Sequence, residues 1–159
     1  MRLALYQPDI PQNTGTMLRL AACLGVGVDL IGPAGFDMSE RAFRRAGLDY
    51  LDHVSIRRHV GWNSFTATRQ QESRRGRLVL LTTQSTESHL DFAFESEDSL
   101  LLGRESAGVP THVHEACDAR VCVPMTPGLR SLNVAVCAAM VLGEALRQTD
   151  GFAPTPKLA

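Results

Sequence analysis

Short apolar runs alternate with stretches of helical periodicity along the whole of this 159-residue chain. The run LVLLTT at 78–83 is the clearest strand, because an unbroken apolar run of this length is typical of a strand buried on both faces. The other expected strands cover 3–6, 28–31, 53–58, 99–102 and 120–124, and the expected helices cover 15–24, 39–47, 62–72, 110–116 and 131–148. This alternation predicts an α/β fold with a mostly parallel sheet flanked by helices.

No internal repeat and no linker divides the chain, so we expect a single domain over residues 1–150 and a flexible C-terminal tail over 151–159. The N-terminus turns polar at Gln7, and the longest apolar run, Val134 to Leu142, is far shorter than the ~20 residues that cross a bilayer. These features favour a cytoplasmic protein without a membrane segment.

The cysteines and arginines of the chain indicate which kinds of site to expect. The four cysteines form no Cys-x-x-Cys pair, so we expect free thiols rather than disulfides or a metal site. Fifteen of the sixteen basic residues are arginine, whose planar fork suits phosphate. The arginine clusters either form a basic face for RNA or are solvated surface charges, and the sequence leaves both readings open: 41/44/45, 57/58 and 74/75/77.

Ligands of parallel sheets bind beyond the C-terminal ends of the strands, and three unusual loops are expected there, after Tyr6, Leu102 and Pro124. In the first loop, QPDIPQNTG, Asn13 is a good N-cap, which predicts a helix beginning near Thr14. Helical side chains lean toward the N-terminus, so Arg19 would point back over Gly15 and share a phosphate with the free N–H groups there. The alternative is an arginine paired with a core carboxylate.

The second loop, LLLGRESAGVP, is bracketed by Gly103 and Gly108. It is not a P-loop, because Val109 and Pro110 stand where Lys and Ser or Thr are needed. No Gly-x-Gly-x-x-Gly follows the first strand, which disfavours a standard dinucleotide fold. A glycine-bounded loop with exposed backbone groups and one carboxylate, Glu105, suits an uncharged or cationic ligand better than a triphosphate.

The third loop, after Pro124, leads to Ser131, which we expect to cap the last helix. That helix is apolar on every side from Val134 to Leu142, with Asn133 as the only polar group near it. A helix that is hydrophobic all round must be covered all round, which indicates a partner subunit.

Together, the stretches PDIPQNTGTMLRL, LLGRESAGVP and VPMTPGLRSLNVAVCAAM resemble the three motifs of the SPOUT, or α/β-knotted, RNA 2′-O-methyltransferases. The resemblance implies a C-terminal trefoil knot and a homodimer formed through the C-terminal helix. The short chain, with no added RNA-binding domain, most resembles the members that act on the wobble pyrimidine of tRNA, which implies the anticodon stem-loop as the substrate. The chain departs from close relatives at Thr16 and Leu24, where Asn and Thr are common.

The same resemblance implies roles for individual residues. S-adenosylmethionine, the methyl donor, would be bound without a metal at Leu81, Gly103, Val123 and Ser131, and Arg19 matches the catalytic arginine. The positions matching RNA-contacting or loop-ordering residues are Asn13, Glu105, Arg130 and Asn133.

A guanidinium with a pKa above ~12 is a poor proton acceptor, so we expect Arg19 to fix a phosphate and stabilise the developing alkoxide. Two alternatives remain: methylation of another tRNA or rRNA site, and a non-catalytic RNA-binding module. A metal enzyme built on His112 and His114 is disfavoured, because helical residues two apart diverge.

Overall fold

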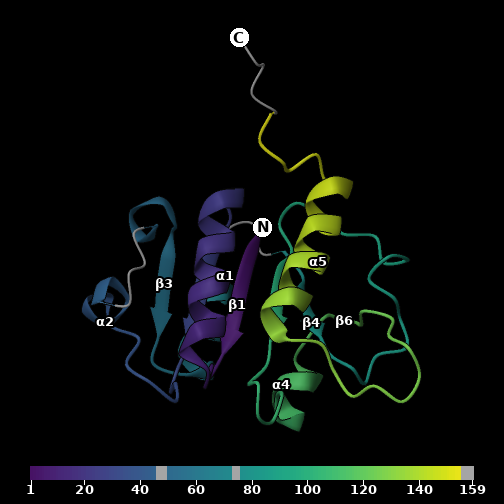
Figure 1. Cartoon of the computed structure of the whole chain (residues 1–159), viewed down its shortest axis with the longest axis horizontal. Coiled ribbons are helices and arrows are strands. Elements are labelled where there is room, and N and C mark those ends of the chain that lie inside the picture. The colour runs from purple at the N-terminus through teal and green to yellow at the C-terminus, as the bar shows by residue number, and fades with distance from the viewer. Residues whose placement is uncertain (46–49, 73–75, 155–159) are drawn as a thin grey trace.

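A computed structural model describes residues 1–45, 50–72 and 76–154 (Figure 1). The strands are β1 (Arg2–Tyr6), β2 (Gly27–Ile31), β3 (Ile56–His59), β4 (Leu78–Leu81), β5 (Ser99–Leu102) and β6 (Ala119–Val121). The helices are α1 (Pro11–Leu24), α2 (Glu40–Arg45), α3 (Trp62–Gln71), α4 (Thr111–Glu115) and α5 (Val134–Gln148), with a 3-10 turn, η1, at Leu51–His53.

The strands form one sheet in the order β3-β2-β1-β5-β4-β6, and every pairing in it is parallel. The α/β architecture predicted from the alternating pattern is therefore confirmed. Parallel neighbours need crossover connections, which bring helices onto the faces of the sheet. In Figure 1, α1 and α5 lie side by side on one face.

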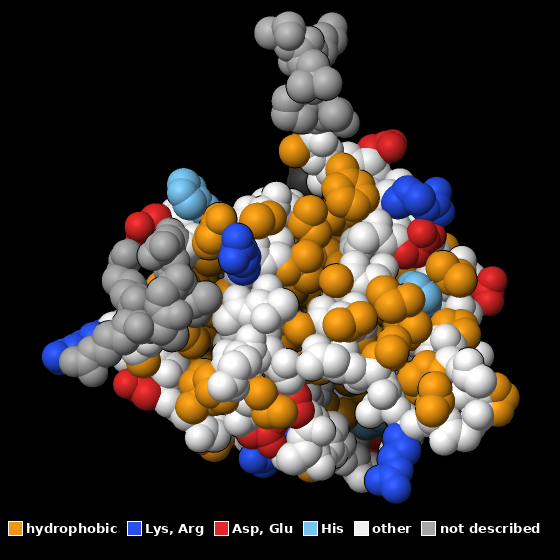
Figure 2. Space-filling model, in the orientation of Figure 1, with side chains coloured by type: hydrophobic (Ala, Val, Ile, Leu, Met, Phe, Trp, Pro, Cys, Tyr) orange, Lys and Arg blue, Asp and Glu red, His pale blue; other side chains and the backbone are white. Residues whose placement is uncertain are grey.

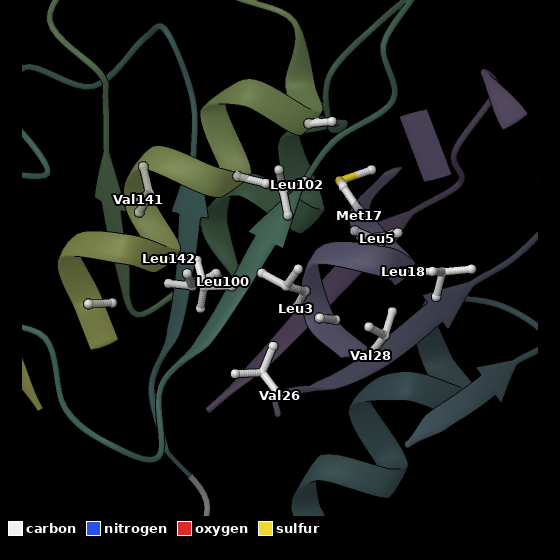
Figure 3. Close-up of a cluster of buried hydrophobic side chains, with 14 of the residues drawn as sticks. Leu3, Leu5, Met17, Leu18, Val26, Val28, Leu100, Leu102, Val141 and Leu142 are labelled. Atoms are coloured by element: carbon white, nitrogen blue, oxygen red, sulfur yellow. The ribbon is translucent and has the colours of Figure 1, made fainter. Parts of the chain in front are cut away.

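Side chains alternate between the two faces of each central strand and fill two apolar clusters. Leu3 and Leu5 of β1 pack with Leu100 and Leu102 of β5 under α1 and α5 (Figure 3). The opposite face of these strands packs against α3 and α4, through side chains that include Ala4, Leu101, Phe65 and Val113. Burial on both faces explains why these strands read as continuous apolar runs.

Two predicted helix starts are wrong. α1 begins at Pro11, with Ile10 as its N-cap, and not near Thr14. Proline suits the first turn because its missing N–H is not needed there. α5 begins at Val134 and is capped by Asn133, not by Ser131. Asparagine caps as well as serine, and Asn133 stands directly before the apolar run.

Several predictions fall partly on residues outside those described. Ser39 does accept a hydrogen bond from the Ala42 N–H (3.2 Å) at the start of α2, but the expected end at Gly47 lies outside the described residues. So do Arg74, Arg75 and most of the tail over 151–159. The strand expected over 53–58 is displaced to Ile56–His59, because η1 occupies the residues before it.

The connection between β4 and β5 contacts the chain on both sides of the last loop. Near β6, the Cys122 N–H donates to the Glu87 carbonyl (2.8 Å) and Cys122 accepts from the His89 N–H (2.9 Å). Near the end of α5, the Gln148 side chain bonds the backbone of Phe92 and Phe94 (3.0 and 2.9 Å). This connection is thereby fixed between β6 and the C-terminal end of α5.

Candidate functional site

The C-terminal ends of β4 and β5 and the chain beyond β6 open onto a cavity of about 430 Å³. The four positions expected to hold a small ligand, Leu81, Gly103, Val123 and Ser131, all line it. Leu81 is the last residue of β4 and Gly103 directly follows β5, and the two strands pair in register with Leu81 opposite Leu102, so the two residues lie at the same edge of the sheet. The volume lies within the range of small-molecule sites.

A tight turn built by two glycines forms one wall of the cavity. Arg104 and Gly108 exchange backbone hydrogen bonds of 2.9 and 2.8 Å. Gly108 has a positive φ of 66°. A β-carbon on Gly103 would come within 2.6 Å of the Gly108 carbonyl carbon, so only glycine permits this close approach. The turn thereby lies close against the cavity, where its backbone is available to a ligand.

The first and second loops are joined by a reciprocal pair of hydrogen bonds. The Asp9 N–H donates to Glu105 Oε2 (3.0 Å), and the Glu105 N–H donates to Asp9 Oδ1 (3.1 Å). The Ser106 hydroxyl also donates to Asp9. Hydrogen bonds with Glu105 and then Ser106 lower the pKa of Asp9 to about 2, so this carboxylate is charged at neutral pH.

A chain of side-chain amides extends this contact to the third loop. Asn13 Nδ2 donates to Glu105 Oε1 (3.2 Å), and Asn133 Nδ2 donates to Asn13 Oδ1 (2.9 Å). Asn133 Oδ1 in turn accepts the N–H groups of Ala135 and Val136 (2.9 and 3.3 Å). Asn13 lies 92 positions from Glu105 and 120 positions from Asn133 in sequence, yet the fold brings the three together at the cavity wall.

Arg19 and Arg130 do not line the cavity of their own chain. Arg19 lies on the exposed side of α1, with its guanidinium 4.6 Å from the centre of the Tyr50 ring and Nη2 3.1 Å from the Tyr50 hydroxyl. It stands eight residues past Pro11, about 12 Å along the helix. The prediction that it shares a phosphate with the first N–H groups of the helix depended on a start near Thr14 and loses its basis. Arg130 is exposed in the third loop.

Three residues that line the cavity or contact its loops or Arg19 were not identified from the sequence: Asp9, Arg104 and Tyr50. Asp9 and Arg104 lie in the loops already identified, and a charged side chain next to a strand end was the available signal. The contact of Tyr50 with Arg19 spans 31 positions and leaves no local pattern.

The cysteines carry no disulfide, and burial raises the pKa of the Cys137 thiol at the cavity wall. Among the residues described, no three histidines, cysteines or acids come together as metal ligands. His112 and His114 both lie on α4, as expected. None of the helices within the described ranges is long and apolar enough to span a membrane.

Comparison with known proteins identifies a matching family, a similar relative and two similar solved structures. The SpoU rRNA Methylase family model matches residues 1–143. A tRNA (cytidine(34)-2′-O)-methyltransferase of Beijerinckia indica is 61% identical over 151 residues, which cover 95% of this chain and 93% of the relative.

Two solved structures are similar along most of this chain. One, from work on the 2-OH methylation of C/U34 on tRNA, has a TM-score of 0.83 and 39% identity, and the match covers 92% of this chain and 94% of the other. The other is the SpoU methyltransferase AviRb of Streptomyces viridochromogenes in complex with the cofactor AdoMet. Its TM-score is 0.82 at 28% identity, over 93% of this chain and 57% of AviRb.

Proposed function

The chain belongs to the SpoU rRNA methylase family, and we propose that it methylates the ribose 2′-oxygen of the wobble pyrimidine, nucleotide 34, of tRNA. S-adenosylmethionine is the methyl donor. The observation that carries the proposal is the cavity, which the three expected loops build together and which Leu81, Gly103, Val123 and Ser131 all line. We also propose a cytoplasmic location, which a tRNA substrate supports.

The cavity fits this donor by its chemistry. Its walls are mainly apolar side chains and backbone, with few charges, which suits an adenosine and a sulfonium better than a polyphosphate. When bound, the donor supplies an electrophilic methyl group for in-line displacement by the ribose oxygen. The chain's own part is to hold the two reactants in line, which is worth roughly 7–11 kcal/mol in favourable cases.

We assign Arg19 the catalytic role. A guanidinium is a poor base, so it fixes the adjacent phosphate and stabilises the negative charge that develops on the ribose oxygen, while the proton passes to phosphate or water. Since Arg19 lies outside its own cavity, it serves the cavity of a partner subunit. Asn13, Glu105 and Asn133 order the loops, and Arg130 contacts the RNA.

A homodimer built on α5 supplies that partner. Leu132, Val136 and Met140 are 40%, 50% and 44% exposed, and Figure 2 shows hydrophobic side chains gathered over α5 and the neighbouring α1. Apolar side chains on two packed helices favour a twofold interface. The tRNA anticodon stem-loop then crosses both subunits.

We also propose that residues 1–150 act as one domain and that its C-terminal part forms a trefoil knot. The last loop leads from the edge strand β6 back to α5, which packs on α1 and β5 in the middle of the sheet. The connection between β4 and β5 is bonded to Cys122 and to Gln148 at either end of this path. Passage of the last loop through this connection makes the knot, and a crystallographic chain trace tests it.

The function is tested by incubating the protein with labelled S-adenosylmethionine and total RNA and mapping the modified riboses. Methylation at nucleotide 34 of tRNA supports the proposal. Methylation at another tRNA or rRNA nucleotide contradicts the substrate assignment. A protein that calorimetry shows to bind no donor contradicts the whole proposal and leaves a non-catalytic RNA-binding module.

The role of Arg19 is tested by mixing two inactive variants, Arg19→Ala and Gly103→Ala. If Arg19 serves the partner's cavity, mixed dimers contain one intact composite site, and activity returns to about a quarter of wild type at equal mixing. Arg19→Ala alone should bind donor as wild type does. Wild-type turnover in Arg19→Ala, or no recovery in verified mixed dimers, contradicts the assignment.

A further inference from the structure

Arg104 lines the cavity with most of its hydrogen-bonding capacity unused. A guanidinium carries five N–H donors. In this structure Nη1 reaches Gln7 Oε1 at 3.5 Å, the outer limit of a hydrogen bond, and Nε lies 3.8 Å from Asp9 Oδ2. Nε is buried and has no hydrogen-bond partner among the described residues. Buried donors are normally satisfied, so this one points to a missing acceptor.

The surroundings favour an anionic acceptor. Among the described residues that line the cavity, Arg104 is the one basic side chain and Glu105 the one acidic side chain. Both oxygens of Glu105 already accept hydrogen bonds, from the Asp9 N–H and from Asn13. Asp9 forms an ion pair with Arg104, but at 3.8 Å it is too distant to accept a hydrogen bond from Nε, so the guanidinium keeps N–H donors free for a ligand.

We propose that Arg104 binds an oxyanion of a ligand at this cavity through its planar guanidinium. Two ligands of the proposed reaction carry such a group: the donor, in the α-carboxylate of its methionine end, and the tRNA, in its phosphates. Both match the arginine fork, which binds carboxylate and phosphate by parallel N–H bonds. Arg104 is among the residues that line the cavity, which favours the donor carboxylate. This inference rests on the proposed function.

Substitution of Arg104 should leave the turn itself in place. Its backbone N–H and carbonyl pair with Gly108, and these bonds do not depend on the side chain. Arg104→Met keeps much of the aliphatic volume and removes the charge, whereas Arg104→Lys keeps the charge and removes the fork. Arg147→Met is the matched control, because Arg147 lies near the end of α5 and bonds Glu144 away from the cavity.

The experiment measures the Kd of the dimeric protein for S-adenosylmethionine and for decarboxylated S-adenosylmethionine, which lacks the carboxylate. We expect Arg104→Met to weaken binding of S-adenosylmethionine about tenfold and to leave binding of the decarboxylated donor unchanged. Arg104→Lys should fall between Arg104→Met and wild type, and Arg147→Met should match wild type.

A second arm measures tRNA binding as a function of salt. If the oxyanion is a phosphate, Arg104→Met leaves both donor affinities unchanged, weakens tRNA binding and lowers the slope of log K against log salt by about one. Equal weakening of both donors with unchanged tRNA binding, or no change in any affinity, overturns the inference. A wild-type protein that binds neither donor instead defeats the proposed function.

Discussion

At the scale of single residues, Asn133 both caps α5 and connects two loops, and a different side-chain atom serves each role. Its carbonyl oxygen caps α5 by accepting the Ala135 and Val136 N–H groups. Its amide nitrogen donates to Asn13 and so continues the chain of bonds to Glu105. The stability of the helix and the order of the loops can therefore be separated by substitution.

We expect Asn133→Ala to lose both roles and to lower the free energy of unfolding by about 1 kcal/mol, the usual cost of a lost N-cap. Asn133→Asp keeps the capping oxygen and removes the amide N–H that bonds Asn13. Its stability should therefore stay near wild type, while its affinity for S-adenosylmethionine falls several-fold. Urea denaturation and calorimetry give the two quantities. Equal loss of stability in both variants would contradict this division.

Asp9, also a single residue, makes the free energy of unfolding depend on pH. Its pKa is lowered from 3.8 to about 2, first by the hydrogen bond with Glu105 and then by that with Ser106. A lowered carboxyl pKa stabilises the fold above the unfolded-state value near 4, and this contribution is lost as the pH falls toward 2. We expect wild type to lose about 1 kcal/mol more than Asp9→Asn between pH 5 and pH 2.5, a figure reduced for solvent screening.

The measurement is urea unfolding of both proteins at the two pH values. Glu144, whose pKa is also lowered to about 2 by its bonds with Arg147 and Gln148, titrates in the same range and contributes equally to both proteins. Parallel pH profiles for wild type and Asp9→Asn would rule out a contribution from Asp9.

At the scale of elements, the turn from Gly103 to Gly108 has no room for a side chain at Gly103. Alanine at 103 would place its β-carbon 2.6 Å from the Gly108 carbonyl carbon, so the turn must open. We expect Gly103→Ala to weaken donor binding at least tenfold by calorimetry. The control Gly61→Ala meets its nearest atom at 3.8 Å, and it should bind donor as wild type does. Unchanged binding by a folded Gly103→Ala would show that the turn does not shape the donor site.

The central strands and the three loops could be predicted, because strands buried on both faces have continuous apolar sequences, as in the run at 78–83. The bounds of the edge strand β3 could not, because only its first and last residues are shielded from solvent. The helix starts could not, because more than one capping residue stands before each apolar run. Ser131 and Asn133 are both good caps, and only the packing of α5 selects between them. The order of the strands depends on non-local pairings such as that of Arg2 with Ser99, and Asn13 meets Glu105 from 92 positions away, so no local pattern contains either.

At the scale of the whole molecule, the outer face of α5 is apolar and remains exposed in a single chain. Val136 and Met140 are about half exposed on it. We expect Val136→Glu to place a charge in the proposed interface and to yield monomers at micromolar concentration by sedimentation. Val60→Glu is the control, because Val60 is 90% exposed at the end of β3 and lies far along the chain from α5. A Val136→Glu protein that sediments as a dimer would exclude this face as the interface.

The Asn133 cap stands where two surfaces of α5 meet. The first turn of the helix closes the cavity through Val134 and Cys137, and the intervening Val136 faces outward. Donor binding in the cavity and the proposed dimerisation would both act on this helical turn, and thermodynamic linkage then requires that each changes the equilibrium constant of the other by the same factor. A methyl donor that binds the dimer more tightly than the monomer would therefore also promote self-association.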